Sequence, residues 1–214
     1  MNDYSKYIDR TNALRYMGFK GSAPDHFLSV VGECEELLSE SMTPRCVYIV
    51  RSVEEISDIL VGEDIITHLS GCDTAVVFAA TLGSKVDSLI QKYQMTDVTK
   101  ALVIDAEASA ATEMFCDEMT EKIALSLNGK LTSRFSPGYG DYPLEIQKDL
   151  LRLVDAERKI GLYAGESYML SPCKSVTAVI GISDISADKK HTTCYACDMK
   201  DTCAFRREDK LCEL

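Results

Sequence analysis

The sequence predicts an α+β fold, and three observations lead to this class. A length of 214 residues, with 46% hydrophobic side chains, is enough for one large domain with a real core. Segments of helical periodicity and short β-rich segments both occur along the chain. They do not alternate regularly as strand, helix and strand, which disfavours a doubly wound parallel sheet. We therefore expect one α+β domain over residues 1–185 and a separate tail over residues 186–214.

Two amphipathic helices are expected first. Asp9 can cap a short helix that runs to Tyr16 and ends at Gly18. Pro24 precedes the stretch DHFLSVVGECEELLSES, in which apolar residues recur at helical spacing and acidic residues lie on the outer face. Pro44 then ends this second helix.

Two strands and two further helices follow. The stretch RCVYIVR (45–51) is short and β-rich, and TAVVFAATLG (74–83) is a continuous apolar run typical of a buried strand. Residues 63–71 predict a brief helix, and SKVDSLIQKYQ (84–94) predicts a longer one.

The longest periodic segment predicts a helix from about Asp97 to Leu127. The side chains on the apolar face of this helix are small over AEASAAT, which would allow close packing or the close approach of a ligand. The remaining segments predict a strand, an amphipathic helix and two more strands, at 130–135, 144–157, 166–170 and 175–183.

The net charge of −11 and the apolar pattern exclude some classes of protein. With 34 acidic and 23 basic residues, the chain is a poor match for the phosphate backbone of a nucleic acid. Its longest apolar run is far shorter than the about 20 residues of a membrane-spanning helix. The first 20 residues also lack the apolar core of a secretory signal. We therefore expect a cytoplasmic protein that binds neither nucleic acid nor membranes.

The loop SRFSPGYGDYP (133–143) is the most constrained segment of the chain. It holds two of the five prolines and two of the twelve glycines. Pro137 restricts the preceding residue to extended geometry, and Gly138 can adopt the positive φ of a type II turn. The backbone N–H and C=O groups of such a loop suit an adenine edge or a carboxylate, and Arg134 adds a planar guanidinium. The alternative is a structural turn whose arginine pairs with a surface acid.

The segment from Asn128 to Ser183 resembles the activation domain of cobalamin-dependent methionine synthase. That family has an R-x-x-P-G-Y loop followed by a helix, an Ile-Gly and Glu-Ser stretch, a proline and a serine-containing strand. The chain has these landmarks in the same order, as Arg134, Pro137, Gly138, Tyr139, Ile160, Gly161, Glu166, Ser167, Pro172 and Ser175. Upstream, Ser109 and Glu113 match an S-x-x-x-E pattern on the long helix.

This resemblance implies a twisted antiparallel sheet with flanking helices and a shallow site for S-adenosylmethionine (AdoMet). Arg134 and the backbone of Pro137, Gly138 and Tyr139 would be the main contacts, and Tyr139 would face cobalamin. Glu113 would lie near the sulfonium or amino group of AdoMet; the alternative for Glu113 is an exposed helix acid.

In that family the domain repairs the enzyme. A donor such as flavodoxin or ferredoxin supplies one electron to cob(II)alamin, and the methyl group of AdoMet is then transferred to cobalt. No proton moves, so we expect no catalytic acid or base, and His26, His68 and His191 belong to no catalytic motif.

The chain is too short for the modules that bind homocysteine, folate and cobalamin. The resemblance therefore implies a free-standing protein that reactivates, by methyl transfer, a separate methionine synthase lacking its own activation domain. The partner would supply the cobalamin. The alternatives are a corrinoid-protein partner or chaperone that does not use AdoMet, and a small metal-binding redox protein.

Nine cysteines divide into two groups. The tail contains Cys194, Cys197, Cys203 and Cys212, and the first two have the Cys-x2-Cys spacing of chelating thiolates. The other spacings are irregular, so zinc and an iron–sulfur cluster are equally compatible. The alternatives are a redox dithiol and a reduced tail without metal. The other five cysteines are expected to be buried, reduced thiols: Cys34, Cys46, Cys72, Cys116 and Cys173.

Overall fold

The computed structural model of the chain describes residues 4–19, 23–127 and 129–183. Its centre is a four-stranded sheet in which every neighbouring pair of strands is antiparallel. In spatial order the strands are β1 (Arg45–Ser52), β2 (Thr74–Thr81), β6 (Ser175–Ser183) and β3 (Lys130–Leu131). The predicted α+β class with an antiparallel sheet and flanking helices is confirmed.

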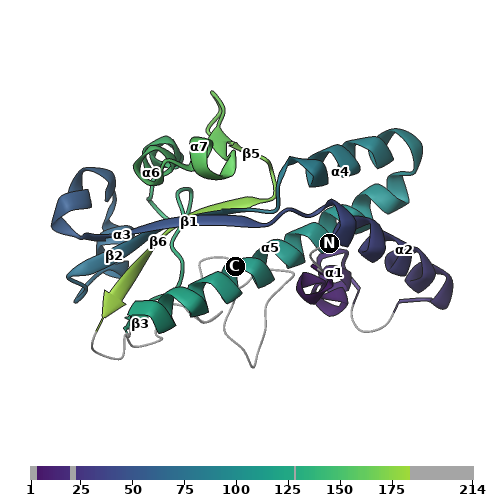
Figure 1. Cartoon of the computed structure of the whole chain (residues 1–214), viewed down its shortest axis with the longest axis horizontal. Helices are drawn as coiled ribbons and strands as arrows, with labels where there is room; N and C mark the ends of the chain where they lie inside the picture. The colour runs from purple at the N-terminus through teal and green to yellow at the C-terminus, as the bar shows by residue number, and fades with distance from the viewer. Residues whose placement is uncertain (1–3, 20–22, 128, 184–214) are drawn as a thin grey trace.

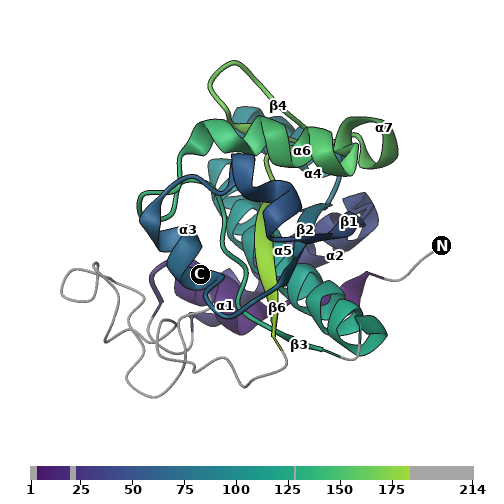
Figure 2. The same ribbon diagram turned by 90° about the vertical axis from the view of Figure 1, so that its left-hand side faces the viewer.

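Helices cover both faces of this sheet (Figure 1). On one face lie η1 (Ser5–Tyr7), α1 (Arg10–Tyr16), α2 (Asp25–Ser41), α4 (Ser84–Thr96) and α5 (Val98–Leu127). On the other face lie η2 (Glu54–Ile59), α3 (Glu63–His68), η3 (Leu144–Ile146), α6 (Gln147–Val154) and α7 (Ala156–Ile160). The side view separates the same layers, with α6 and α7 above the sheet and α5 below it (Figure 2).

Strand β2 is buried on both faces, because a core lies on each side of the sheet. Alternate side chains of a strand point to opposite faces. One set packs in the core beneath α2, α4 and α5, and the other packs beneath α3, α6 and α7: Val76, Phe78 and Ala80 in the first, and Ala75, Val77 and Ala79 in the second. All six are at most 1% exposed, so the continuous apolar run has the location that the sequence predicted.

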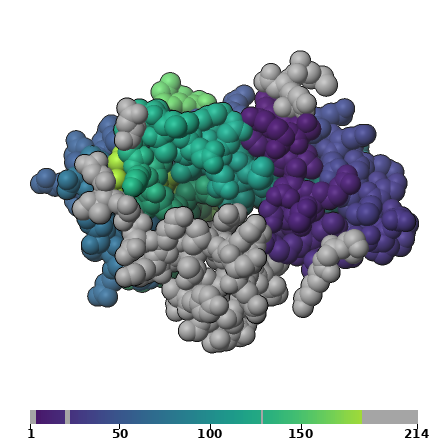
Figure 3. All heavy atoms as spheres, turned by 90° about the horizontal axis from the view of Figure 1, so that it is seen from below, coloured from purple at the N-terminus to yellow at the C-terminus, as the bar shows by residue number. Residues whose placement is uncertain are grey.

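Helix α5 is the long helix expected from the periodic segment. Its small residues Ala108 and Ala111 are fully buried in the same core as Phe78 and Ile180. The small side chains therefore allow α5 to pack closely against the sheet. Helix α1 contacts the opposite side of α5, and the two lie side by side on the surface seen from below (Figure 3).

The chain after the loop differs from the prediction in two places. The helix expected over 144–157 is divided into η3, α6 and α7; Asp155, in the left-handed conformation with φ 57°, separates α6 from α7. The strand expected over 166–170 is wrong. Residues 165–169 form the turn between two short strands, β4 (Tyr163–Ala164) and β5 (Leu170–Ser171), which pair with each other.

The cysteine predictions are confirmed in part. Cys34, Cys72 and Cys116 are buried and Cys46 is partly buried, but Cys173 is exposed in the turn before β6, so its prediction is wrong. Burial raises the pKa of the Cys34 and Cys46 thiols to about 12, which keeps them protonated and unreactive.

The tail cysteines Cys194, Cys197, Cys203 and Cys212 lie outside the described residues, as do His191 and the boundary expected at residue 185. Within the described ranges, no group of three or more His, Cys, Asp or Glu side chains could hold a metal ion. No helix in those ranges is long and apolar enough to cross a membrane.

Candidate functional site

A β-bulge precedes the loop and determines which way its arginine points. Leu131 pairs with Ile182, and Phe135 forms an isolated bridge with Val179, so four steps along the chain after β3 are matched by three steps along β6. Such an extra residue bends a strand and exchanges the faces to which its side chains point. Leu131 packs in the core beneath α5, whereas Phe135 packs in the core of the opposite face.

Thr132 stabilises this bulge by taking part in two hydrogen bonds with Gly181. Its backbone N–H donates to the Gly181 carbonyl at 3.0 Å, and its Oγ1 accepts from the Gly181 N–H at 2.9 Å. The side-chain oxygen thus takes the place of a backbone acceptor in the ladder.

The bulge directs Arg134 towards α5, where two carboxylates bind it. Arg134 Nη2 lies 2.8 Å from Glu113 Oε2, and Nη1 lies 2.6 Å from Asp117 Oδ1. Nη1 also lies 3.4 Å from Thr120 Oγ1. We call these three charged side chains the Arg134 cluster.

The Arg134 cluster is half-enclosed and carries a net charge of −1. The Arg134 side chain is only 16% exposed, and Glu113 and Asp117 are more accessible. Burial alone would lower the pKa of the Arg134 guanidinium, but the Asp117 and Glu113 carboxylates outweigh it and raise the pKa. The guanidinium therefore stays charged, as recognition of a carboxylate requires.

A polar row on α5 extends from this cluster towards the start of β6. Its members are four residues apart and so share one side of the helix: Asp105, Ser109, Glu113 and Asp117. At the far end, Lys174 Nζ lies 2.8 Å from Asp105 Oδ1 and 2.9 Å from Ser109 Oγ. Ser109 and Glu113, which match the family pattern, therefore lie between two basic side chains, Lys174 and Arg134, that are both paired with acids on α5.

The Pro-Gly-Tyr loop begins three residues after Arg134 and is a closed turn. The Gly138 N–H donates to the Tyr142 carbonyl at 2.8 Å, and the Tyr142 N–H donates to the Tyr139 carbonyl at 2.9 Å. Gly138 has φ 93°, the positive value that the sequence predicted. Pro137 is buried, whereas the Tyr139 side chain is 47% exposed.

Helix α3 braces the loop, and this support was not predicted. His68 at its end packs against Phe135, with ring centroids 4.9 Å apart and the rings tilted, and its Nε2 lies 3.0 Å from the Ser133 carbonyl oxygen. At its beginning, the Glu63 and Asp64 N–H groups donate to the Asp141 carboxylate.

The structure thus brings Glu113 to Arg134 and places Pro137, Gly138 and Tyr139 in one hydrogen-bonded turn. The pairing of Arg134 with acids, which the alternative of a structural turn requires, is present in the structure. Glu166 and Ser167 lie exposed in the turn between β4 and β5. Asp117 was missed, although its spacing of four residues from Glu113 on a predicted helix indicates that both carboxylates share one side.

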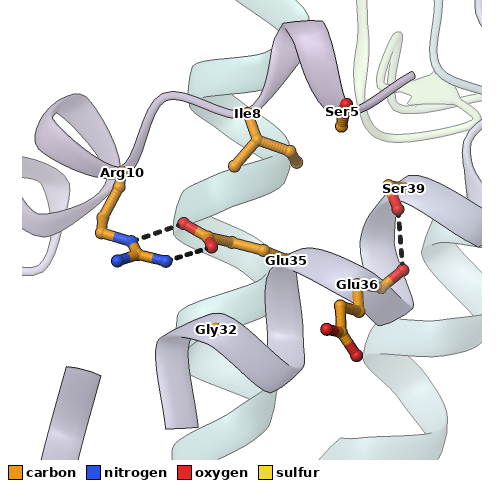
Figure 4. A pocket seen from close by; sticks show the side chains of 7 residues that line it. All are labelled: Ser5, Ile8, Arg10, Gly32, Glu35, Glu36 and Ser39. Carbon is orange, nitrogen blue, oxygen red and sulfur yellow. Dashed lines mark hydrogen bonds and ion pairs between the residues drawn. The ribbon is translucent and has the colours of Figure 1, made fainter. Parts of the chain in front are cut away.

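A shallow hollow of about 510 Å³ lies elsewhere, between α1 and α2 (Figure 4). Arg10 and Glu35 meet across it through two hydrogen bonds, of which the Nε–Oε1 bond is 2.7 Å. None of its lining residues belongs to the predicted site, and the basic side chain in it, Arg10, is already paired with Glu35.

Comparisons with known proteins show the fold. No protein-family profile matches the sequence, and no curated protein matches it. Thirteen chains of solved structures match. One is the crystal structure of the MetH reactivation domain bound to AdoHcy, with a TM-score of 0.64 and 16% identity, covering 86% of this chain and 76% of that chain. The chain therefore has the fold of the MetH reactivation domain, the fold that the sequence resemblance implied.

Proposed function

We propose that the chain binds AdoMet at the Arg134 cluster and uses it to remethylate the cobalamin of a separate methionine synthase. One observation carries the proposal: Arg134, from the predicted loop, and Glu113, from α5, meet at 2.8 Å although 21 residues separate them. They do so on a fold shared with a domain that has been crystallised with AdoHcy.

The charges of the cluster suit those of AdoMet. The ligand carries a carboxylate, an ammonium and a sulfonium, for a net charge of +1, and the cluster carries −1. In this proposal the ligand carboxylate replaces one protein carboxylate on Arg134, in the bidentate geometry that guanidinium favours. Glu113 and Asp117 are then available to the two cationic groups of the ligand. Because protein ion pairs are exchanged for ligand ion pairs, no buried charge is left unpaired.

The reaction that follows is balanced without a protein acid or base. One electron from a donor such as flavodoxin or ferredoxin converts cob(II)alamin into cob(I)alamin. The methyl group then leaves sulfur as its C–S bond breaks and a Co–C bond forms, which releases the neutral thioether AdoHcy. The contribution of this chain is to hold the sulfonium in line with cobalt and to exclude water.

Tyr139 is the residue that we expect to face the corrin of the partner. It follows the two turn residues directly, and about half of its side chain is accessible. A residue that must contact a second protein cannot be covered by its own fold, and Tyr139 meets this condition.

A second candidate is a corrinoid-protein partner that does not use AdoMet. The observation that favours it is the closed state of the cluster, since two carboxylates already bind Arg134. A ligand carboxylate must displace one of them. Calorimetric titration with AdoMet separates the two candidates, because only the first requires binding.

The proposal is tested by reactivation in trans. The protein is mixed with the cob(II)alamin form of a methionine synthase lacking its activation domain, a one-electron reductant and AdoMet labelled on its methyl group. We expect the label to appear on cobalt only when this protein is present.

Two controls accompany the assay. AdoHcy in place of AdoMet should give no methylcobalamin, because it has no methyl group to transfer. Labelling of cobalt at the same rate without the protein would contradict the proposed function and leave the AdoMet-independent partner as the better candidate.

A further inference from the structure

Asp64 and Asp141 bond to each other's backbone across 77 residues. The Asp141 carboxylate accepts from the Glu63 N–H at 2.6 Å and from the Asp64 N–H at 3.0 Å. In return, the Asp64 carboxylate accepts from the Asp141 N–H at 3.1 Å. We call these three hydrogen bonds the Asp64–Asp141 latch.

The latch fixes the far side of the Pro-Gly-Tyr turn. Phe135 anchors the near side through its pairing with Val179. Tyr142 anchors the return of the chain, because its buried ring donates a hydrogen bond from its hydroxyl group to the Ile59 carbonyl at 3.0 Å. Tyr139 lies between these anchors, two residues before Asp141.

Gly140 allows the latch to close. A Cβ atom at this position would collide with the Asp64 carboxylate, and the backbone has φ 52°, a conformation that favours glycine. A larger residue at 140 would therefore push the loop away from α3.

We propose that the latch holds the Pro-Gly-Tyr loop in its ligand-binding conformation, and that Asp141 is a positioning residue for AdoMet. This inference rests on the proposed function. A loop that samples other conformations is in its binding-competent conformation only part of the time. Its apparent affinity is then the intrinsic affinity multiplied by the competent fraction. The latch raises that fraction without touching the ligand.

A direct electrostatic role is the alternative, because AdoMet is cationic and Asp141 is exposed. The two roles predict different results for Asp141→Asn. Asparagine keeps an oxygen that accepts a backbone N–H and is as effective as aspartate at this task, but it carries no charge. A positioning role is therefore largely preserved in Asp141→Asn, and a charge role is lost.

The experiment compares Asp141→Ala, Asp141→Asn and Asp64→Ala in the full chain. We expect Asp141→Ala to weaken AdoMet binding about tenfold in calorimetry, and Asp141→Asn to stay within about threefold of the wild type. Asp64→Ala removes one of the three bonds and should have an intermediate effect. Asp9→Ala is the matched control, since Asp9 accepts the Asn12 N–H at 3.0 Å at the start of α1.

Hydrogen exchange of the backbone amides is measured on the same proteins. Asp141→Ala should speed exchange at residues 62–65 and 138–142 and leave β2 protected, which also shows that the variant is folded. If it does not fold, Asp64→Ala takes its place in both measurements.

The possible outcomes are distinct. Unchanged AdoMet affinity in the latch variants, or equal losses in Asp141→Ala and Asp141→Asn, overturns the positioning role. Unchanged exchange in the loop overturns the latch itself. If the wild type does not bind AdoMet, the proposed function is contradicted instead, and the exchange pattern alone decides whether the latch holds the loop.

Discussion

At the scale of single residues, Arg134 keeps its charge although burial of the guanidinium alone would lower its pKa. Its two carboxylate partners reverse this effect on its pKa. Removing one partner of such a buried pair leaves the other uncompensated. Changes at Arg134, Glu113 and Asp117 are therefore coupled and should not add.

The first prediction concerns Arg134. A charge-assisted contact to the AdoMet carboxylate contributes about 1.5–3 kcal/mol, so Arg134→Ala should raise the dissociation constant of AdoMet about 10- to 100-fold. Calorimetry measures the change. Arg152→Ala is the matched control, because Arg152 also pairs with a carboxylate, at 2.8 Å from Asp149, but lies on α6. Equal affinities for the Arg134 variant and the wild type would remove Arg134 from the site.

The second prediction concerns Glu107, a buried acid on α5. Its side chain is 1% exposed, and neither carboxylate oxygen has a hydrogen-bond partner among the described residues. Burial and the nearby Glu35 raise its pKa to about 8, while Arg10 opposes this shift. The folded state therefore holds the Glu107 proton at pH values where the unfolded chain has lost it.

The free energy of unfolding should consequently fall as the pH rises from about 4.5 to about 8, by up to about 1.4 kcal/mol per pH unit. Glu107→Gln removes this dependence, so the variant should gain stability relative to the wild type across that range. Urea unfolding at pH 5, 6, 7 and 8 measures it, with the exposed Glu121→Gln on the same helix as the control. A constant difference between wild type and Glu107→Gln at all four pH values would show that Glu107 ionises normally.

At the scale of elements, the sequence was informative where a pattern is long. The apolar run of β2 and the 30-residue periodicity of α5 are both longer than any competing local signal. Strands β4 and β5 are two residues each, too short for alternation to be visible. The left-handed Asp155 that divides α6 from α7 has no such signal either: aspartate can adopt this conformation, but a single aspartate within an amphipathic pattern does not specify it.

The candidate site likewise has a part that the sequence predicted and a part that it did not. Arg134 and the Pro-Gly-Tyr loop were predicted because their residues are adjacent in sequence and resemble a known family. The supporting contacts of Asp141 and His68 could not be predicted, because they join segments 65 to 78 residues apart. Only the folded sheet shows that α3 lies under the loop.

At the scale of the whole molecule, the net charge of −11 bears on partner binding. We expect the partner to present basic residues around its corrin, so that association is faster and tighter at low salt. Raising the salt concentration from 0.05 to 0.5 M should raise the dissociation constant of the complex at least about tenfold. Sedimentation velocity or surface binding measures it, and an affinity independent of salt would contradict this expectation.

The tail gives the last prediction. We expect Cys194, Cys197 and Cys203, with Cys212, to bind zinc or an iron–sulfur cluster, because the Cys-x2-Cys spacing suits chelation. Elemental analysis of anaerobically purified protein should find close to one metal site per chain, and Cys194→Ser with Cys197→Ser should abolish it. Metal-free protein with four freely titratable tail thiols would reject the prediction.

The bulge before the loop makes the site depend on the geometry of the backbone as well as on residue identity. Because side chains alternate along a regular strand, the same residues without the bulge would exchange the faces to which Arg134 and Phe135 point. The guanidinium would then enter the apolar layer around Val179, and Phe135 would face Glu113. A homologous chain could therefore contain every residue of the motif and still lack the site. One residue fewer between Leu131 and Arg134 would instead let a regular strand keep both side chains on their present faces, so a single-residue gap in an alignment does not by itself remove the site.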